Sequence, residues 1–125
     1  MTFTSMAMKK TLYGIANCDS VKKARAWLAA QGQDVAFHDF KKQGLERATA
    51  AAWLEQVDWE VLVNRKGTTW RQLPEERRAA VLDKASALAL MLEFTSVIKR
   101  PVLQGPHGLE VGFSDERYRH FLKLS

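Results

Sequence analysis

The sequence predicts an α/β fold, with a mixed four-stranded sheet, flanking helices and a helical insertion. Three observations predict it. An apolar strand pattern near the N-terminus is followed at once by an amphipathic helix and a second strand pattern. The middle of the chain carries helical patterns only. Near the C-terminus, two strand patterns flank a Gly-Pro-His-Gly turn.

Length and composition fit one globular domain, residues 1–125. The chain is 46% hydrophobic and 26% charged, with 7 glycines and 3 prolines, which excludes disordered and collagen-like classes. A single cysteine cannot form an internal disulfide. No apolar stretch approaches the roughly 18 residues of a membrane helix, and the start lacks a secretory apolar region. We therefore expect a cytoplasmic protein that does not bind membranes, and a flexible extension over residues 1–7, because Met8 can serve as the start.

The first part of the chain predicts a β-α-β unit. Residues 11–15 form a short apolar strand. Val21, Ala24 and Leu28 then recur at helical spacing, and Gly32 supplies a stop. Residues 34–40 alternate as a second strand should. Such a unit pairs its strands in parallel.

The middle of the chain predicts helices. Residues 45–57 have one apolar face, and a further helix begins near Leu73 and Pro74, because proline suits a first helical turn. Residues 64–72 contain Gly, Asn and Thr and predict a loop. Residues 85–92 carry no charge, which predicts a helix buried on every side.

The last part of the chain predicts a hairpin and a closing helix. Residues 96–103 and 109–113 are the two strand patterns, and Ser114 can cap a helix that runs to about Leu124. The hairpin adds antiparallel pairs to the parallel pair, so the sheet is expected to be mixed. This order matches the thioredoxin-like plan.

Cys18 lies between the first strand and the first turn of the first helix. Chemistry in open α/β sheets gathers at the carboxyl ends of strands, and a helix N-terminus stabilises a thiolate. Lys22 and Lys23 add positive charge nearby, whereas Asp19 opposes it. The alternative is that Cys18 is a small buried hydrophobe. The residue pattern alone leaves both interpretations open.

Five segments together resemble the arsenate reductase-like family of thioredoxin-fold proteins, closest to its YffB-type branch. They are LYGIANCDSVKKARAWL, FHDFKKQGL, LVNRKGTTWRQL, ASALALMLEFTSVIKRPVL and GLEVGFSDERY, in order over nearly the whole chain. The resemblance implies that Cys18 is the nucleophile and that Arg65 and Arg100 bind the oxyanion. It also implies a cis peptide bond before Pro101. We include Asn17 and Pro101 with the two arginines as anion-binding candidates.

The chain departs from the arsenate reductases at two places. Gly112 stands where they carry a third arginine, and Asp19-Ser20-Val21 replaces their small-residue run followed by arginine. Both departures argue against arsenate as the substrate. Valine at position 21 also excludes a Cys-x-x-Cys switch.

The sequence thus favours a glutathione-dependent thiol reductase, in which glutathione is the co-substrate and an external thiol resolves the intermediate on Cys18. The substrate would be glutathionylated or a disulfide. The alternative is a non-catalytic adaptor that binds RNA polymerase or another protein. We do not expect nucleic-acid binding, a variant in which Lys66, Trp70 and Arg71 would make the contacts.

Ordinary structural roles compete with several of these assignments. Arg65 can be part of a solvated basic loop, and Arg100 a charge at a strand edge. Trp70 is expected to pack, and the basic residues of the first helix to face solvent. His38, His107 and His120 lack ligand spacing, so we expect no metal.

Overall fold

The computed structural model describes residues 9–124, and the chain divides into two compact units. The first unit combines the N-terminal part up to Gln43 with the part from Arg100 onward, and the second spans Gly44 to Lys99. The second unit corresponds to the helical insertion that the sequence predicts. The expected extension over residues 1–7 lies outside the described residues, and the assignment of one domain stays a prediction.

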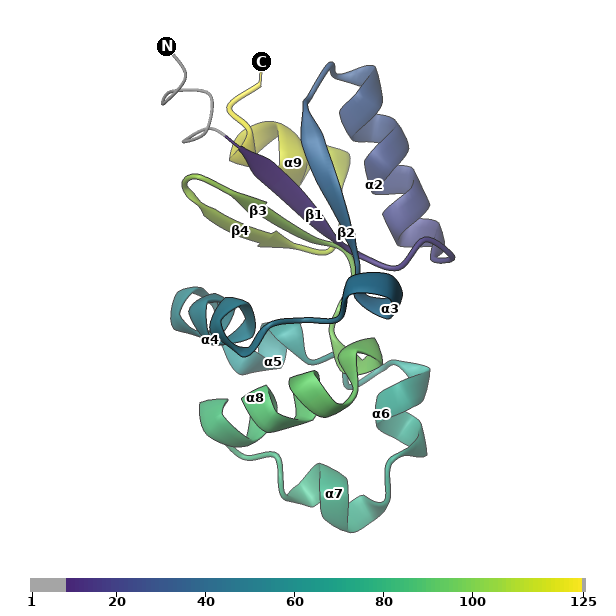
Figure 1. Ribbon diagram of the computed structural model, residues 1–125, viewed down its shortest axis with the longest axis vertical. Coiled ribbons are helices and arrows are strands. Elements are labelled where there is room, and N and C mark those ends of the chain that lie inside the picture. Colours follow the sequence, from purple (N-terminus) through teal and green to yellow (C-terminus); the bar gives the residue numbers. More distant parts are fainter. Residues whose placement is uncertain (1–8, 125) are drawn as a thin grey trace. The chain divides into compact units, whose positions relative to one another are not determined.

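The first unit contains a four-stranded sheet in the order β2-β1-β3-β4 (Figure 1). The strands are β1 (Lys10–Gly14), β2 (Val35–Asp39), β3 (Val102–Gly105) and β4 (Gly108–Val111). β1 pairs in parallel with β2 and antiparallel with β3, and β3 pairs antiparallel with β4. The mixed sheet and the thioredoxin-like plan are therefore confirmed.

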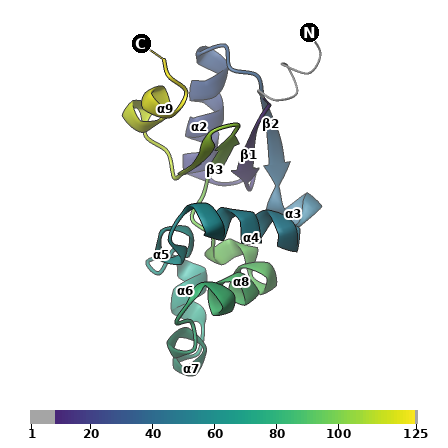
Figure 2. The ribbon, with the colours of Figure 1, turned by 90° about the vertical axis from the view of Figure 1, so that its left-hand side faces the viewer.

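Helices α2 (Asp19–Ala30) and α9 (Asp115–Phe121) cover the same face of this sheet (Figure 2). Leu12 and Leu103 are cross-strand partners, so they point to one face, where they form a buried core with Leu28 and Tyr118. Burial of each such leucine contributes about 1.5–3 kcal/mol. The core anchors both helices and thereby fixes the start of α2 beside the sheet. The short α3 (Phe40–Gln43) follows β2.

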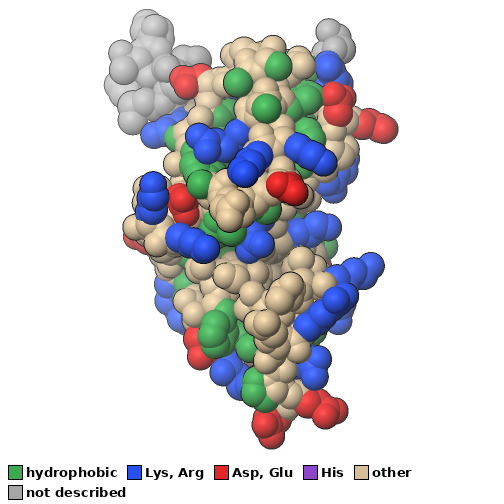
Figure 3. Space-filling model, turned by 90° about the vertical axis from the view of Figure 1, so that its right-hand side faces the viewer, with side chains coloured by type: hydrophobic (Ala, Val, Ile, Leu, Met, Phe, Trp, Pro, Cys, Tyr) green, Lys and Arg blue, Asp and Glu red, His purple; other side chains and the backbone are tan. Residues whose placement is uncertain are grey.

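The ends of α2 and α9 follow from the sequence. After α2, Gly32 has a φ of +68°, a left-handed conformation that suits glycine, so the predicted stop is confirmed. The side chain of Ser114 accepts a hydrogen bond from the backbone N–H of Arg117, so the predicted cap of α9 is confirmed too. The basic residues of α2 are exposed as expected, and Lys and Arg are prominent on the face in Figure 3. The expected end of the last helix near Leu124 is wrong, because α9 ends at Phe121.

The second unit is helical. It contains α4 (Arg47–Gln56), α5 (Trp59–Leu62), α6 (Thr68–Gln72), α7 (Glu75–Ala79), α8 (Lys84–Glu93) and the 3₁₀ helix η1 (Thr95–Val97). α4 packs on α8, and both α8 and α6 contact η1. Trp53, Leu90 and Met91 are buried between these elements.

Three expectations for the central and following residues are wrong. The predicted loop 64–72 contains α6, whose N-cap is Gly67. Leu73, which follows this helix, is buried, and its packing outweighs the weak helix propensity of the two threonines. The helix over 85–92 is not buried on every side: Ala85 and Ala89 are exposed, because an alanine methyl exposes little apolar area.

The predicted strand 96–103 begins only at Val102. Val97 and Ile98 belong to the second unit instead. There Ile98 forms an isolated bridge with Val63, and the carbonyl of Val97 accepts the N–H of Asn64 at 2.7 Å. The short α5 was not expected from the sequence.

Candidate active site

Cys18 occupies the N-cap of α2, four residues after β1 ends. Its backbone is extended, with φ −146° and ψ 124°, and its carbonyl accepts the N–H of Lys22 at 2.9 Å. The side chain is a free, half-buried thiol. The sequence therefore places its cysteine at the first turn of α2, where unpaired backbone N–H groups can meet a negative charge.

A close contact sets the path of the chain into this turn. A Cβ built on Gly14, the last residue of β1, would lie 2.6 Å from Cγ2 of Val21. Val21 is fully buried in the first turns of α2. Glycine at position 14 thus lets α2 approach the end of β1 and holds Cys18 beside the sheet.

The environment of the thiol favours its ionised form. Partial burial raises the pKa of Cys18, but hydrogen bonds from the backbone N–H of Val21 and from the Arg100 guanidinium lower it. The positive charge of Arg100 and the N–H of Ser20 lower it further, so the pKa lies below the ordinary value of a cysteine. A lowered pKa raises the fraction of nucleophilic thiolate at neutral pH.

Arg100 reaches the sulfur from the segment before β3. The Arg100–Pro101 peptide bond is cis, as the family resemblance implies. Pro101 is buried, and its carbonyl accepts the N–H of Gly112 at 2.7 Å. The sequence-predicted pair of Cys18 and Arg100 is thus brought together within the first unit. Asn17 is exposed and directly precedes the thiol.

Arg65 lies in the second unit, between α5 and α6. Its Nη2 donates to Oε2 of Glu60 at 2.9 Å, and its guanidinium lies 5.6 Å from the ring centroid of Trp59. The side chain is 49% exposed. Its meeting with Cys18 stays a prediction.

Arg65 lines a hollow of about 310 Å³ within the second unit. Its charged lining comprises Arg65, Lys66, Lys99 and Glu60. Three cations face one carboxylate, so this hollow can accept an anionic group. Glu60 and Lys99 were not among the residues predicted from the sequence; the short spacing between Glu60 in α5 and Arg65 after it was the available signal.

Gly112 stands at the position where the family resemblance implies a third arginine. Its φ is +87°, a conformation that disfavours residues with a Cβ. Its carbonyl accepts the hydroxyl of the buried Tyr118 at 2.9 Å. The backbone at this position therefore favours the glycine itself.

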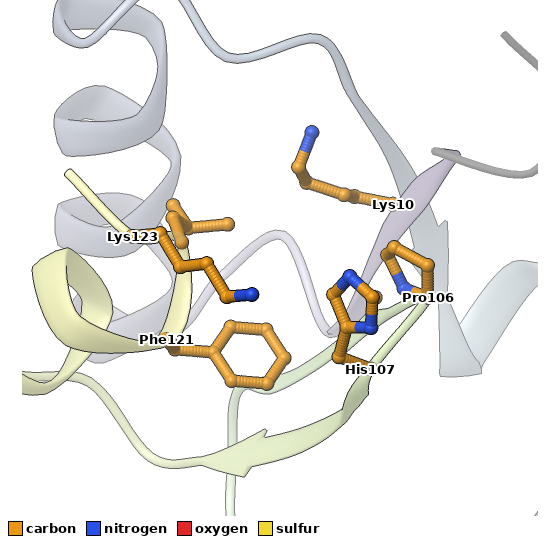
Figure 4. Close-up of a pocket in the computed structure, with 7 residues that line it drawn as sticks. Lys10, Pro106, His107, Phe121 and Lys123 are labelled. Atoms are coloured by element: carbon orange, nitrogen blue, oxygen red, sulfur yellow. The ribbon is translucent and has the colours of Figure 1, made fainter. Parts of the chain in front are cut away.

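A separate hollow, about 80 Å³ in volume, lies in the first unit (Figure 4). Lys10, His107, Phe121 and Lys123 contribute to its lining. Lys10 begins β1, whereas Cys18 follows the other end of that strand, so this hollow is not part of the thiol site.

Within residues 9–124, no cluster of three or more His, Cys, Asp or Glu side chains could hold a metal ion. No helix in that range has the length and apolarity to span a bilayer.

Comparisons with known proteins extend over nearly the whole chain. The ArsC family model matches residues 13–121. A solved structure of a YFFB protein is 42% identical, covers 90% of this chain and 97% of its own, and superimposes with a TM-score of 0.84. An arsenate reductase (ArsC) related protein from Brucella melitensis is 50% identical, covers 94% of this chain and 97% of its own, and has a TM-score of 0.72.

A more distant relative bears a regulatory name. The global transcriptional regulator Spx 1 of Lactococcus lactis is 24% identical over 113 residues, which cover 89% of this chain and 87% of the relative. Proteins similar to this chain therefore bear both arsenate reductase-related and regulatory names.

Proposed function

This chain belongs to the ArsC family, and we propose that it is a glutathione-dependent thiol reductase with Cys18 as its nucleophile. The observation that supports this most is the hydrogen bond from Arg100 to the sulfur of Cys18. Fixed positive charge beside a thiol favours the thiolate, which is the nucleophilic form. A purely structural cysteine has no need of such a partner.

The proposed reaction uses one cysteine and one molecule of free glutathione per turnover. The Cys18 thiolate attacks the glutathione sulfur of a glutathionylated substrate; a bond forms between these sulfurs, and the substrate leaves as a thiolate that takes up a proton. Glutathione thiolate then attacks the Cys18–glutathione disulfide. Oxidised glutathione leaves and the Cys18 thiolate is regenerated, so the substrate disulfide is reduced and glutathione is oxidised.

The two arginines would hold the carboxylates of glutathione. Arginine suits this task, because its planar guanidinium can pair with a carboxylate through two hydrogen bonds and stays charged. Arg100 would act beside the sulfur, with Asn17 and Pro101 as neighbours on the same unit. Arg65, with Lys66 and Lys99 around it, would supply a second anion site.

Arsenate is a weaker candidate for the substrate. The family resemblance implies a third arginine where this chain has Gly112, and the positive φ of Gly112 disfavours any replacement there. A disulfide substrate needs less anion binding at the reacting atom than an arsenate oxyanion. A reducing compartment such as the cytoplasm would supply the glutathione.

The direct test is turnover of a glutathionylated peptide by wild type and Cys18→Ser, with each protein analysed by mass spectrometry for a glutathione adduct. We expect wild type to release the peptide thiol and to carry one glutathione on Cys18. Serine at this position should abolish both. Wild type without turnover and without adduct would contradict the proposal.

A second candidate function is a non-catalytic adaptor that binds RNA polymerase or another protein. The relation to the regulator Spx 1 favours it. Affinity capture from lysate with wild type and Cys18→Ser separates the two functions. RNA polymerase retained equally by both proteins would favour the adaptor, whereas partners captured only by wild type, through a disulfide that reductant releases, would favour the reductase.

A further inference from the structure

Tyr118 of α9 makes a buried polar contact that the reaction scheme does not use. Its side chain is fully buried in the core of the first unit, and its hydroxyl donates to the carbonyl of Gly112 at 2.9 Å. The rings of Trp27 and Phe113 pack edge-on against it. Burial of a hydroxyl costs free energy unless the group is hydrogen-bonded, so the bond to Gly112 offsets the cost of burying the Tyr118 hydroxyl.

The same peptide segment leads to the thiol. Gly112 donates its N–H to the carbonyl of Pro101 at 2.7 Å. This bond continues the ladder beyond the last paired residues of β3 and β4, Val102 and Val111. Pro101 directly follows Arg100, whose guanidinium donates to the sulfur of Cys18. Three hydrogen bonds, the backbone of Gly112 and the pair Arg100–Pro101 therefore connect the Tyr118 hydroxyl to the thiol.

The chemistry of Tyr118 suits a permanent donor. Burial raises the pKa of its phenol well above the ordinary value, so the hydroxyl keeps its proton. Gly112 has a φ of +87°, a conformation that its neighbours must hold. The Tyr118 hydroxyl is the side-chain group that fixes the Gly112 carbonyl.

We propose that Tyr118 is a positioning residue for the reaction: through Gly112 and Pro101, its hydroxyl holds the Arg100 guanidinium against the sulfur of Cys18. This inference rests on the proposed function, because it requires Cys18 to react as a thiolate. It adds a residue of α9 to a site that otherwise consists of the start of α2 and the segment before β3.

The test is the pH dependence of Cys18 alkylation in Tyr118→Phe, which keeps the ring and removes the hydroxyl. With Arg100 held less firmly, we expect the thiol pKa to rise by about half a unit and the rate at pH 7 to fall about threefold. The rate at high pH, where every thiol is ionised, should stay as in wild type. If the Phe variant fails to fold, 4-aminophenylalanine at position 118 retains a donor and should give a rate between those of wild type and Arg100→Gln.

Two controls separate positioning from a general loss of stability. Ser114→Ala removes the cap of α9 without touching the hydroxyl, and should leave the thiol pKa unchanged. In an Arg100→Gln background, Tyr118→Phe should cause no further change of the thiol pKa, since the two changes act on one contact. A shift of equal size in Ser114→Ala, or an additive shift in the double variant, would overturn the proposal.

Failure of this inference differs from failure of the proposed function. If the wild-type thiol reacts with the pH profile of a free cysteine, the proposed function fails. If the wild-type thiol is activated and Tyr118→Phe retains that profile, only the positioning role of Tyr118 fails.

Discussion

The guanidinium of Arg100 donates a hydrogen bond to the sulfur of Cys18. The two residues come from the two separate segments of the first unit, one after β1 and one before β3. β1 and β3 are neighbours in the sheet and run antiparallel, so the end of one strand lies beside the start of the other. The contact is therefore a consequence of sheet topology.

Replacement of Arg65 by glutamine should weaken substrate binding and leave the fold intact. The Arg65–Glu60 pair is half-exposed, so its loss should lower the free energy of unfolding by less than about 1 kcal/mol. Loss of a charge-assisted hydrogen bond to a glutathione carboxylate should raise the KM for a glutathionylated peptide about tenfold. Arg47→Gln, an exposed arginine of α4, is the control. An unchanged KM would assign Arg65 to the solvated surface.

Gly14→Ala should destabilise the protein by about 1–3 kcal/mol, because the new methyl group would overlap Val21 at the start of α2. Urea unfolding followed by circular dichroism measures the loss. The double variant Gly14→Ala, Val21→Ala removes the overlap, and should be less destabilised than the sum of the two single variants. Strictly additive losses would contradict close packing at this point.

Gly112→Ala should also destabilise the protein, here through the backbone. A φ of +87° disfavours a residue with a Cβ, at a cost of about 1–2 kcal/mol. Gly105→Ala is the matched control within the same hairpin, because a Cβ there meets Phe121 at an ordinary 3.4 Å. Its effect on the free energy of unfolding should be clearly smaller. Equal losses in the two variants would show that the conformation of Gly112 is not the cause.

The stability of the protein should depend on the ionisation of Cys18. Its pKa is lower in the folded protein than in an unfolded chain, so the folded state binds fewer protons between the two values. Stability from this group is therefore fully present above the unfolded pKa of about 8.5, and is lost as pH falls through the folded pKa. Measured against Cys18→Ser, the free energy of unfolding of wild type should rise over this window. A difference that stays flat or falls with pH would oppose a lowered pKa.

Much of the fold could be predicted because local patterns decide it. Residues close together in the sequence determine several features: the strand before Cys18, the apolar face of α2, the turn between β3 and β4, and the cap at Ser114. The second unit was harder. Leu62 at the end of α5 and Leu73 after α6 are buried, and neither helix has the length that makes a helical period visible.

Some residues of the candidate site could likewise be predicted from the sequence, and others could not. Cys18 could be placed at a helix start from its neighbours, and the family resemblance implied Arg65 and Arg100. The Val21 N–H follows from the predicted helix start, since it lies in the first turn after Cys18. The role of the Tyr118 hydroxyl could not be predicted, because its contact with Gly112 forms only when α9 packs in the first unit. Lys99 was missed because it is distant from Arg65 in the sequence, whereas Glu60 lies only five residues before Arg65 and that spacing could have indicated it.

The measurement that bears most directly on the central claim is the alkylation rate of Cys18 as a function of pH, in wild type and in Arg100→Gln. A thiolate stabilised by Arg100 predicts a wild-type midpoint below the value of about 8.5 for a free cysteine, and an upward shift in the variant. A wild-type midpoint at or above that value, unchanged when Arg100 is replaced, would contradict the account.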